Sequence, residues 1–183
     1  MSKRELKSII DAILFAWAEP IHIDEIMKVI EQDKKTTREL IRELQDECEH
    51  YRRGIVLNNY DDYYQYSTRS EHDEYLKKLT KSSPRKITSS TMEVLAIIAY
   101  NQPVTRIEID NIRGVKSYSS IDTLKAKGLI EEVGRLDVVG KPVLYGTTIQ
   151  FLKMFNLSSL DELPKIENLE ELNTILENEN DEN

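Results

Sequence analysis

Hydrophobic positions between residues 90 and 148 follow a helical period three times and then the period of strands. The first helical stretch, MEVLAIIAY, is apolar on nearly every face, which is typical of a buried helix. Ser90 and Glu93 fit a capping box at its start, and Pro103 marks its end. We therefore predict a buried helix between these two signals.

Two further helices are predicted in the same stretch. Thr105 and Glu108 repeat the capping box, and Gly114 suits the left-handed residue that ends a helix. The inward residues expected of this helix are Ile107, Ile109 and Ile112. The next helix is expected to begin after Ser117, to bury Ile121 and Leu124, and to stop at Gly128.

A hairpin follows the third of these helices. LIEEV and PVLYGTT read as two strands, and the turn region between them contains Gly134, Asp137 and Gly140. Three short helices followed by a hairpin are the pattern of a winged helix, in which the hairpin is the wing.

The first 80 residues show a similar series of helices. Ser2 and Glu5 fit a capping box before an amphipathic helix that Pro20 stops. DEIMKVIEQ forms a second helix, for which the expected inward residues are Ile26, Val29 and Ile30. The third helix is expected to start at Thr36, in a capping box with Glu39, and to end at Gly54.

A change of period marks a second hairpin in IVLNNYDDYYQYST. Its β-branched and aromatic residues favour strands, and the turn can lie at Asn58 and Asn59 or at Asp61 and Asp62. Residues 71–79 are expected to close this unit as a fourth helix.

The two halves resemble each other as a diverged repeat. A shift of 83 positions superposes AWAEPIHIDEI on AYNQPVTRIEI. We predict an α+β fold, mainly α, with two tandem winged-helix domains at 1–80 and 91–164. TKSSPRKITSS lacks an apolar period, so residues 81–90 are expected to be a linker.

The end of the chain differs in composition. Residues 165–183 are rich in Glu and Asn, and their scattered apolar residues offset too little of the entropy of ordering. We predict an acidic, disordered C-terminal tail. The alternative is a helix formed on a partner by Leu169, Leu172 and Leu176.

Charge separates the parts of the chain. The formal charge is −4 over residues 1–80, +4 over 81–160 and −8 over 161–183, which gives the total of −8. No run approaches the roughly 20 apolar residues that span a bilayer, and the single cysteine is typical of a reducing compartment. A cytoplasmic protein is expected.

Residues suited to catalysis are scattered. His22, His50 and His72 have no metal-ligand spacing, Cys48 sits on an apolar stripe, and no phosphate-binding glycine loop is present. We therefore expect a binding protein and not an enzyme, without a cofactor or a bound metal.

DNA is a possible partner for a winged helix. The third helix of the first half is nearly balanced in charge, so it gains little from releasing counterions. Basic residues of the second half that could line a phosphate-binding face are Arg113, Lys116, Lys125, Lys127, Arg135 and Lys141. We expect DNA binding only weakly or indirectly, and a protein as the main partner.

Several segments of the second half are similar to one known family. MEVLAIIAYNQPVTRIEIDNIRGV, GLIEEVGRLDVVGKPVLYGTT and FLKMFNLSSLDELP closely resemble segregation and condensation protein B, ScpB. The resemblance covers roughly residues 4–164. It departs from the usual pattern at the wing, where Val139 and Lys141 replace the common proline and arginine around the glycine.

The resemblance implies a non-enzymatic subunit of a bacterial condensin. Members of this family form homodimers, bind the kleisin ScpA and act through it on the SMC ATPase. A nucleoid-associated protein in the cytoplasm is therefore expected, with functions in chromosome condensation and segregation. The alternative from another class is a dimeric winged-helix transcription regulator that binds DNA.

Two sets of residues are predicted to contact these partners. Aromatic residues beyond the needs of a small core form the expected dimer contact: Phe15, Trp17, Tyr60, Tyr63, Tyr64 and Tyr66. Residues of the second half without an obvious role in folding form the expected kleisin site: Tyr100, Gln102, Pro103, Arg113, Arg135, Tyr145, Gly146, Thr147 and Thr148.

Overall fold

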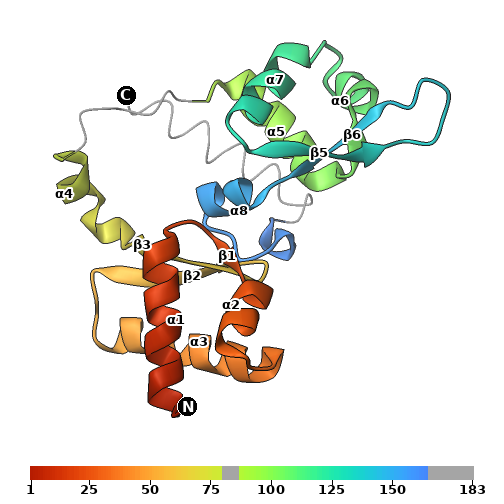
Figure 1. Cartoon of the computed structure of the whole chain (residues 1–183). Helices are drawn as coiled ribbons and strands as arrows, with labels where there is room; N and C mark the ends of the chain where they lie inside the picture. Colours follow the sequence, from red (N-terminus) through yellow and green to blue (C-terminus); the bar gives the residue numbers. More distant parts are fainter. Residues whose placement is uncertain (80–86, 165–183) are drawn as a thin grey trace.

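The computed structural model describes residues 1–79 and 87–164. These residues form two hydrophobic cores, one in each half of the chain, and the halves lie side by side (Figure 1). The tail predicted at 165–183 lies outside the described residues, as do residues 80–86.

The first half places three helices against a three-stranded antiparallel sheet with strand order β1-β3-β2. The elements are α1 (Lys3–Trp17), β1 (Ile21–His22), α2 (Ile23–Ile30), α3 (Lys34–His50), β2 (Ile55–Tyr60) and β3 (Tyr63–Thr68). The helix predicted at 71–79 is shorter and follows a 3-10 turn: η1 (Ser70–His72) and α4 (Asp73–Lys77).

The second half has the same order of helices and strands, with its sheet in the order β4-β6-β5. The elements are α5 (Ser89–Asn101), β4 (Val104–Thr105), α6 (Arg106–Arg113), α7 (Tyr118–Ala126), β5 (Ile130–Arg135), β6 (Val143–Thr147), α8 (Ile149–Phe155) and η2 (Leu160–Glu162). The α+β class is confirmed. Strands β1 and β4 were not predicted, because two residues are too few to show a period.

Two of the predicted capping boxes are confirmed. Ser2 and Glu5 bond each other's backbone amides at the start of α1, and Thr105 and Glu108 do so at α6. The left-handed φ of 70° at Gly114 after α6 is also as predicted. These signals succeed because they need only neighbours in the chain.

Three other predicted helix ends are wrong. Asp33, not Thr36, caps α3, because its carboxylate accepts both the amide and the hydroxyl of Thr36. Thr88 caps α5, so this helix begins at Ser89, inside the segment predicted as a linker. Helix α3 ends at His50, before Gly54 is reached.

Some residues predicted to face inward lie on the surface. Val29 on α2 and both Ile107 and Ile112 on α6 are more than half exposed, whereas Ile109 is fully buried. A short helix in a three-helix unit buries only one narrow stripe, and a run of isoleucines alone does not identify which. The structure thus leaves apolar side chains on α6 available for contact.

The turn of the first hairpin lies at Asp61 and Asp62. Both residues have a left-handed backbone, with φ of 51° and 63°, which matches the two-residue turn that continues the twist of paired strands. Between the two polar pairs that the sequence left open, the structure therefore selects the aspartates.

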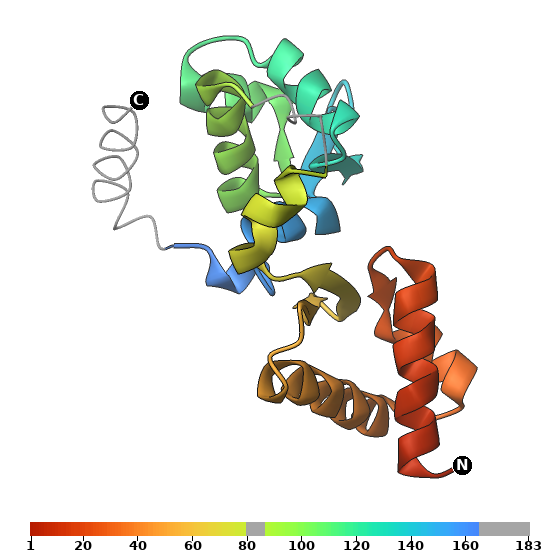
Figure 2. The same ribbon diagram turned by 90° about the vertical axis from the view of Figure 1, so that its left-hand side faces the viewer.

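The tip of this hairpin contacts the second half. Tyr60, at the end of β2, is 3% exposed and belongs to the core of the second half. Next to it the Asp61 amide donates to the Ser158 carbonyl at 2.8 Å. Figures 1 and 2 show from two directions that β2 and β3 face α8, which contacts β2.

Candidate partner-binding site

A groove of about 880 Å³ opens beside α2 in the first half. Its lining combines apolar and acidic side chains: Trp17, Pro20, Ile21, His22, Asp24, Glu25, Met27, Lys28, Glu31, Gln32 and Tyr63. Trp17 remains 60% exposed at its edge. A concave surface with an exposed tryptophan is suited to binding a side chain of a partner.

Strand β1 positions the base of this groove. Ile21 and His22 pair with Tyr64 and Tyr63 of β3, and the ring of His22 meets that of Tyr63 edge-on at 4.8 Å. His22 also caps α2, because its Nδ1 accepts the Asp24 amide at 3.3 Å. The groove thus rests on sheet and helix and not on a loop.

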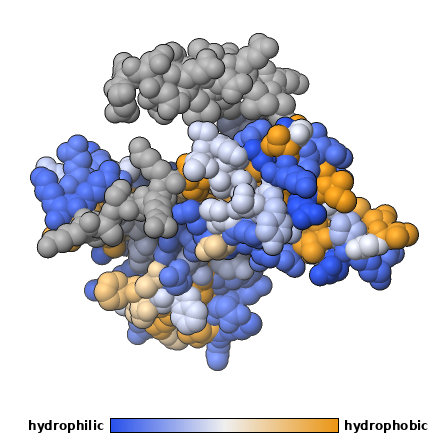
Figure 3. Space-filling view, turned by 90° about the horizontal axis from the view of Figure 1, so that it is seen from above, coloured by the Kyte–Doolittle hydropathy of each residue, from blue (hydrophilic) through white to orange (hydrophobic). Residues whose placement is uncertain are grey.

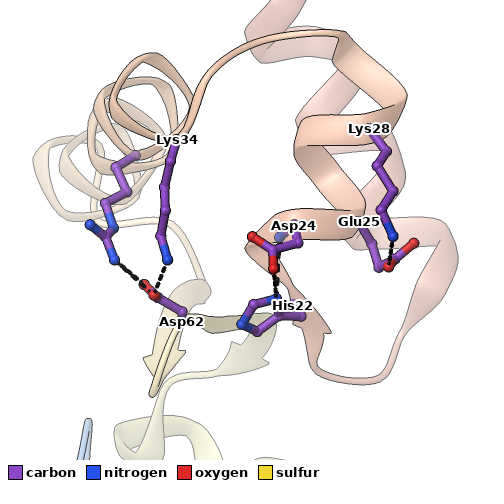
Figure 4. Close-up of polar contacts among 7 residues, drawn as sticks. His22, Asp24, Glu25, Lys28, Lys34 and Asp62 are labelled. Carbon is purple, nitrogen blue, oxygen red and sulfur yellow. Dashed lines mark hydrogen bonds and ion pairs between the residues drawn. The ribbon is translucent and has the colours of Figure 1, made fainter.

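The charges along the groove are mostly negative. Figure 4 shows Lys28 turned to Glu25, whose carboxylate it meets at 2.6 Å. That ion pair raises the pKa of Lys28, and the Glu25 carboxylate compensates the positive charge of the lysine. Asp24 and Glu31 add two more carboxylates, so the groove favours an apolar segment that carries basic residues.

A second polar cluster ties the hairpin turn to α3. Both oxygens of Asp62 accept from Arg38, at 2.8 and 2.7 Å, and Lys34 lies 2.9 Å away (Figure 4). Hydrogen bonds from Arg38, followed by those from Lys34, lower the pKa of Asp62. The cluster therefore holds Tyr60, one residue before the turn, in its orientation toward the second half.

We expect Asp62→Asn to lower the free energy of unfolding by about 0.5–1 kcal/mol at neutral pH, since both basic partners are largely exposed. Asparagine keeps the left-handed backbone available, so the change tests the charge alone. Because the pKa of Asp62 is lowered by folding, its contribution is present above about pH 4 and is lost as the pH falls through the lower folded pKa. Urea titrations of both proteins should converge at low pH; a constant difference down to acid would contradict the assignment.

The residues predicted for the dimer contact divide into two groups. Phe15 is 80% exposed and Trp17 60%, on the last turn of α1. Tyr60 and Tyr64 are buried within this chain, so they do not offer the exposed rings that the predicted dimer contact requires of them. The other two predicted residues, Tyr63 and Tyr66, are half-buried.

Two of these tyrosines are held within the first half or between the halves. The Tyr66 hydroxyl donates to Asp11 on α1; burial, and after it this hydrogen bond, raises the pKa of Tyr66. Tyr60 accepts from the Asn58 amide at 2.9 Å, and burial raises its pKa. Side chains alternate along β2, so Tyr60 and Asn59 point to opposite faces of the strand. No signal in the nearby sequence indicates which of the two cores Tyr60 enters.

The predicted kleisin site contains a clamp between α5 and β6. Oε1 of the Gln102 side chain accepts from the Thr147 backbone amide at 2.7 Å, and its Nε2 donates to the Thr147 hydroxyl and to the Ala99 carbonyl. Gly146 is buried beneath it, and a Cβ there would lie 3.1 Å from Gln102 and 2.9 Å from Val133. These residues shape the second half instead of projecting from it.

Arg113 also has an internal role. Its side chain is 6% exposed and donates to Glu93 at 3.0 Å, to Ser90 at 2.8 Å and to Ser117 at 3.3 Å. Ser90 and Glu93, predicted to cap their own helix, are instead the partners that fasten α5 to α6. Arg113 is therefore not a free anchor for a partner, contrary to the prediction.

The remaining predicted kleisin residues lie in two places. Tyr100 lies on the last turn of α5 and Pro103 follows the end of that helix, and the Tyr100 hydroxyl donates to the Pro164 carbonyl at 2.7 Å. Arg135 is exposed at the outer end of β5 and donates to the Lys141 carbonyl at 3.2 Å. Tyr145 packs on the core and Thr148 donates to the Gly128 carbonyl. Tyr100, Pro103 and Arg135 thus keep the surface position that the prediction requires.

The basic residues considered for DNA are partly used inside the molecule. Arg113 is buried, and Lys125 pairs with Glu132 at 2.5 Å, which raises the pKa of the lysine. Within residues 1–79 and 87–164, no three His, Cys, Asp or Glu side chains are grouped to hold a metal ion. In the same residues no helix is long and apolar enough to cross a membrane.

Comparisons with known proteins agree on one family. Residues 8–166 match the family of segregation and condensation complex subunit ScpB. Segregation and condensation protein B of Alkaliphilus oremlandii (strain OhILAs) is 49% identical over 167 residues, covering 91% of this chain and 90% of that protein.

Two solved structures are also similar in sequence. The crystal structure of ScpB from Mycobacterium tuberculosis is 32% identical, with 86% of this chain and 98% of that chain covered and a TM-score of 0.43. The crystal structure of a dimer of an ScpB N-terminal domain complexed with ScpA peptide is 33% identical, with 42% and 96% covered and a TM-score of 0.41. With a family match over most of its length and a relative almost half identical to it, this chain belongs to the ScpB family.

Proposed function

We propose that this chain is a non-enzymatic subunit of the bacterial SMC–ScpA–ScpB condensin complex, in which it binds the kleisin ScpA and supports chromosome condensation and segregation. The observation that carries the proposal is the family match over residues 8–166, with 49% identity to one relative over nine-tenths of both chains. The ATP chemistry then belongs to SMC, and the chain itself needs no cofactor. It acts in the cytoplasm, on the nucleoid.

We further propose that each half is a winged-helix domain. In each half a helix, a short strand, two helices and two longer strands follow one another, and the short strand joins the sheet at its edge. The hairpins β2–β3 and β5–β6 are then the wings. The first wing packs against the second half of the same chain. This packing supports a role for the wing in protein contacts rather than in DNA binding.

The homodimer contact is placed on the first half. Phe15 and Trp17 expose most of their rings on one end of α1, and burying such rings supplies much of the free energy of a small interface. Tyr60 and Tyr64 no longer belong to this proposal, because the fold of one chain already covers them.

The kleisin site is placed on the second half, at the end of α5. Tyr100 and Pro103 offer an aromatic ring and a rigid apolar ring there, and the Gln102–Thr147 clamp holds the backbone beneath them. The groove beside α2 is a second candidate location, since it is concave, partly apolar and acidic. The related domain described as a dimer complexed with ScpA peptide is an N-terminal one, so a test must include both halves.

The deciding experiment is copurification of the full chain with its cognate ScpA, followed by mass measurement of the complex. We expect a stable complex that contains two copies of this chain. Tyr100→Ala tests the site on the second half, and Met27→Ser tests the groove, because each changes one exposed or half-exposed side chain. Loss of ScpA with Met27→Ser and not with Tyr100→Ala would move the site to the groove.

The same measurement tests the dimer. The double variant Phe15→Ser and Trp17→Ser should give a monomer mass, whereas Tyr51→Ser, an exposed tyrosine elsewhere in the first half, should not. Failure of the unchanged chain to retain ScpA, or a monomer at tens of micromolar protein (~10⁻⁵ M), would overturn the proposal.

A further inference from the structure

The second wing ends in an exposed apolar turn. Strands β5 and β6 are joined by residues 136–142, and we name residues 136–141 the wing tip. Val139 is fully exposed and Val138, its neighbour in the chain, is 51% exposed. Seen from above, hydrophobic residues gather at the projecting end of the second half (Figure 3). Folding of the second half therefore leaves these two valines in water.

Backbone hydrogen bonds fix the shape of the wing tip. The Leu136 amide donates to the Pro142 carbonyl and the Lys141 amide to the Val138 carbonyl, each at 2.9 Å. The Arg135 guanidinium donates to the Lys141 carbonyl at 3.2 Å. Because the turn already has its shape, little conformational entropy is lost when it binds a partner.

The charge around the wing tip is positive. Residues 135–141 contain two basic residues, Arg135 and Lys141, and one acid, Asp137, which gives a net formal charge of +1. Within residues 1–79 and 87–164 the Lys141 ammonium forms no ion pair. A surface that complements the wing tip is therefore concave, partly apolar and acidic.

The groove beside α2 has this chemistry. Its apolar lining includes Trp17, Met27 and Tyr63, and Glu31 is one of its acids. The Glu31 carboxylate forms no ion pair in the part of the chain that the structure describes. A volume of about 880 Å³ is in the range of pockets that enclose a drug-sized ligand, so it has room for two valine side chains.

The wing tip of the same chain does not occupy the groove. The described lining residues run from Trp17 to Tyr63, all in the first half. The hairpin β5–β6 projects from the second half well away from α2 (Figure 1). Tyr60 and the bond from the Asp61 amide to Ser158 hold the two halves together in this arrangement. An occupying wing tip must therefore come from a second copy.

The groove lies beside the proposed dimer contact. Trp17 lines the groove and, with Phe15, is one of the two exposed rings assigned to that contact. A second copy bound at these rings is therefore next to the mouth of the groove. This step rests on the proposed homodimer and not on the location of the ScpA site.

We propose that the wing tip of one copy inserts into the groove beside α2 of a second copy. Val138 and Val139 fill the apolar part of the groove. Lys141 lies beside Glu31. The exchange is reciprocal, so a two-fold axis closes the assembly at two copies.

Disulfide trapping of the full chain tests the proposal. The double variant Met27→Cys and Val139→Cys places one thiol in the groove and one on the wing tip, and the native Cys48 is buried. Mild oxidation should give a covalent dimer, since thiols join only when they are held close together. The matched control is Met27→Cys with Glu131→Cys, which moves the second thiol to an exposed position on β5. It should give about tenfold less covalent dimer.

A charge exchange tests the polar part of the contact. Lys141→Glu in the trapping variant should lower the yield of covalent dimer about fivefold, because one exposed ion pair is replaced by two like charges. Adding Glu31→Lys should restore the yield. Trp17 is the single tryptophan, so its emission should shift to longer wavelengths with Lys141→Glu alone and return in the variant with both changes.

Three results would overturn the proposal. The first is a disulfide within one chain, which would show that the tip reaches its own groove. The second is an equal yield from the Glu131→Cys control. The third is the absence of a covalent dimer, and loss of ScpA by Met27→Ser would then assign the groove to ScpA. A covalent dimer from a chain whose unoxidised form has a monomer mass would support the tip contact and reject the contact at Phe15 and Trp17.

Discussion

Tyr60→Ala is expected to lower the free energy of unfolding by about 3–5 kcal/mol, the cost typical of removing a fully buried aromatic ring. Tyr60 is 3% exposed, and although it ends β2 of the first half it is packed in the core of the second. Its loss also leaves the Asn58 amide without one acceptor. The variant should therefore loosen the second half more than the first.

Residue-resolved hydrogen exchange measures this difference. Protection of α5 and α8 should fall by about 100-fold or more, which corresponds to roughly 3 kcal/mol, while α1 and α3 lose less. Tyr51→Ala removes a tyrosine that is 70% exposed and should change stability by less than about 0.5 kcal/mol. Equal losses in the two halves would show that Tyr60 does not act as their link.

Gly146→Ala is expected to cost about 1–3 kcal/mol, the usual penalty for overpacking a filled site. The added Cβ would lie 2.9 Å from the Val133 side chain and 3.1 Å from Gln102 Oε1. Moving away requires opening the bond from the Thr147 amide to Gln102, so the clamp between α5 and β6 resists the shift. Thermal unfolding followed by circular dichroism provides the measurement.

Gly134→Ala is the matched control, since it lies on the paired strand and its nearest neighbour is Leu144 at 4.0 Å. It should be neutral or slightly stabilising, because alanine has fewer unfolded conformations than glycine. Adding Val133→Ala to Gly146→Ala should recover part of the loss if the Val133 contact causes it. A neutral Gly146→Ala would contradict the close approach.

Some residues predicted for the partner sites have roles inside the fold that the sequence does not reveal. Arg113 and Gln102 each have one partner within four residues, yet their other hydrogen bonds reach residues 20 and 45 positions away. Such bonds leave no periodic signal, because they depend on how three elements meet. The aromatic excess of the first half was a sound observation, but Tyr60 was assigned to a second copy when the second half of the same chain covers it.

Local chemistry determined much of this protein before any tertiary contact was considered. The order of helices, the capping boxes at Ser2 and Thr105 and the left-handed Gly114 follow from neighbours within four residues. Residue-by-residue similarity carried the family assignment. Only the tertiary structure decided that Asp61 and Asp62 form the turn, that Ile107 and Ile112 face solvent, and that Arg113 is enclosed. Each of these depends on which side chains become buried in a core. Packing between distant segments decides that, and the hydrophobic pattern within a single segment does not.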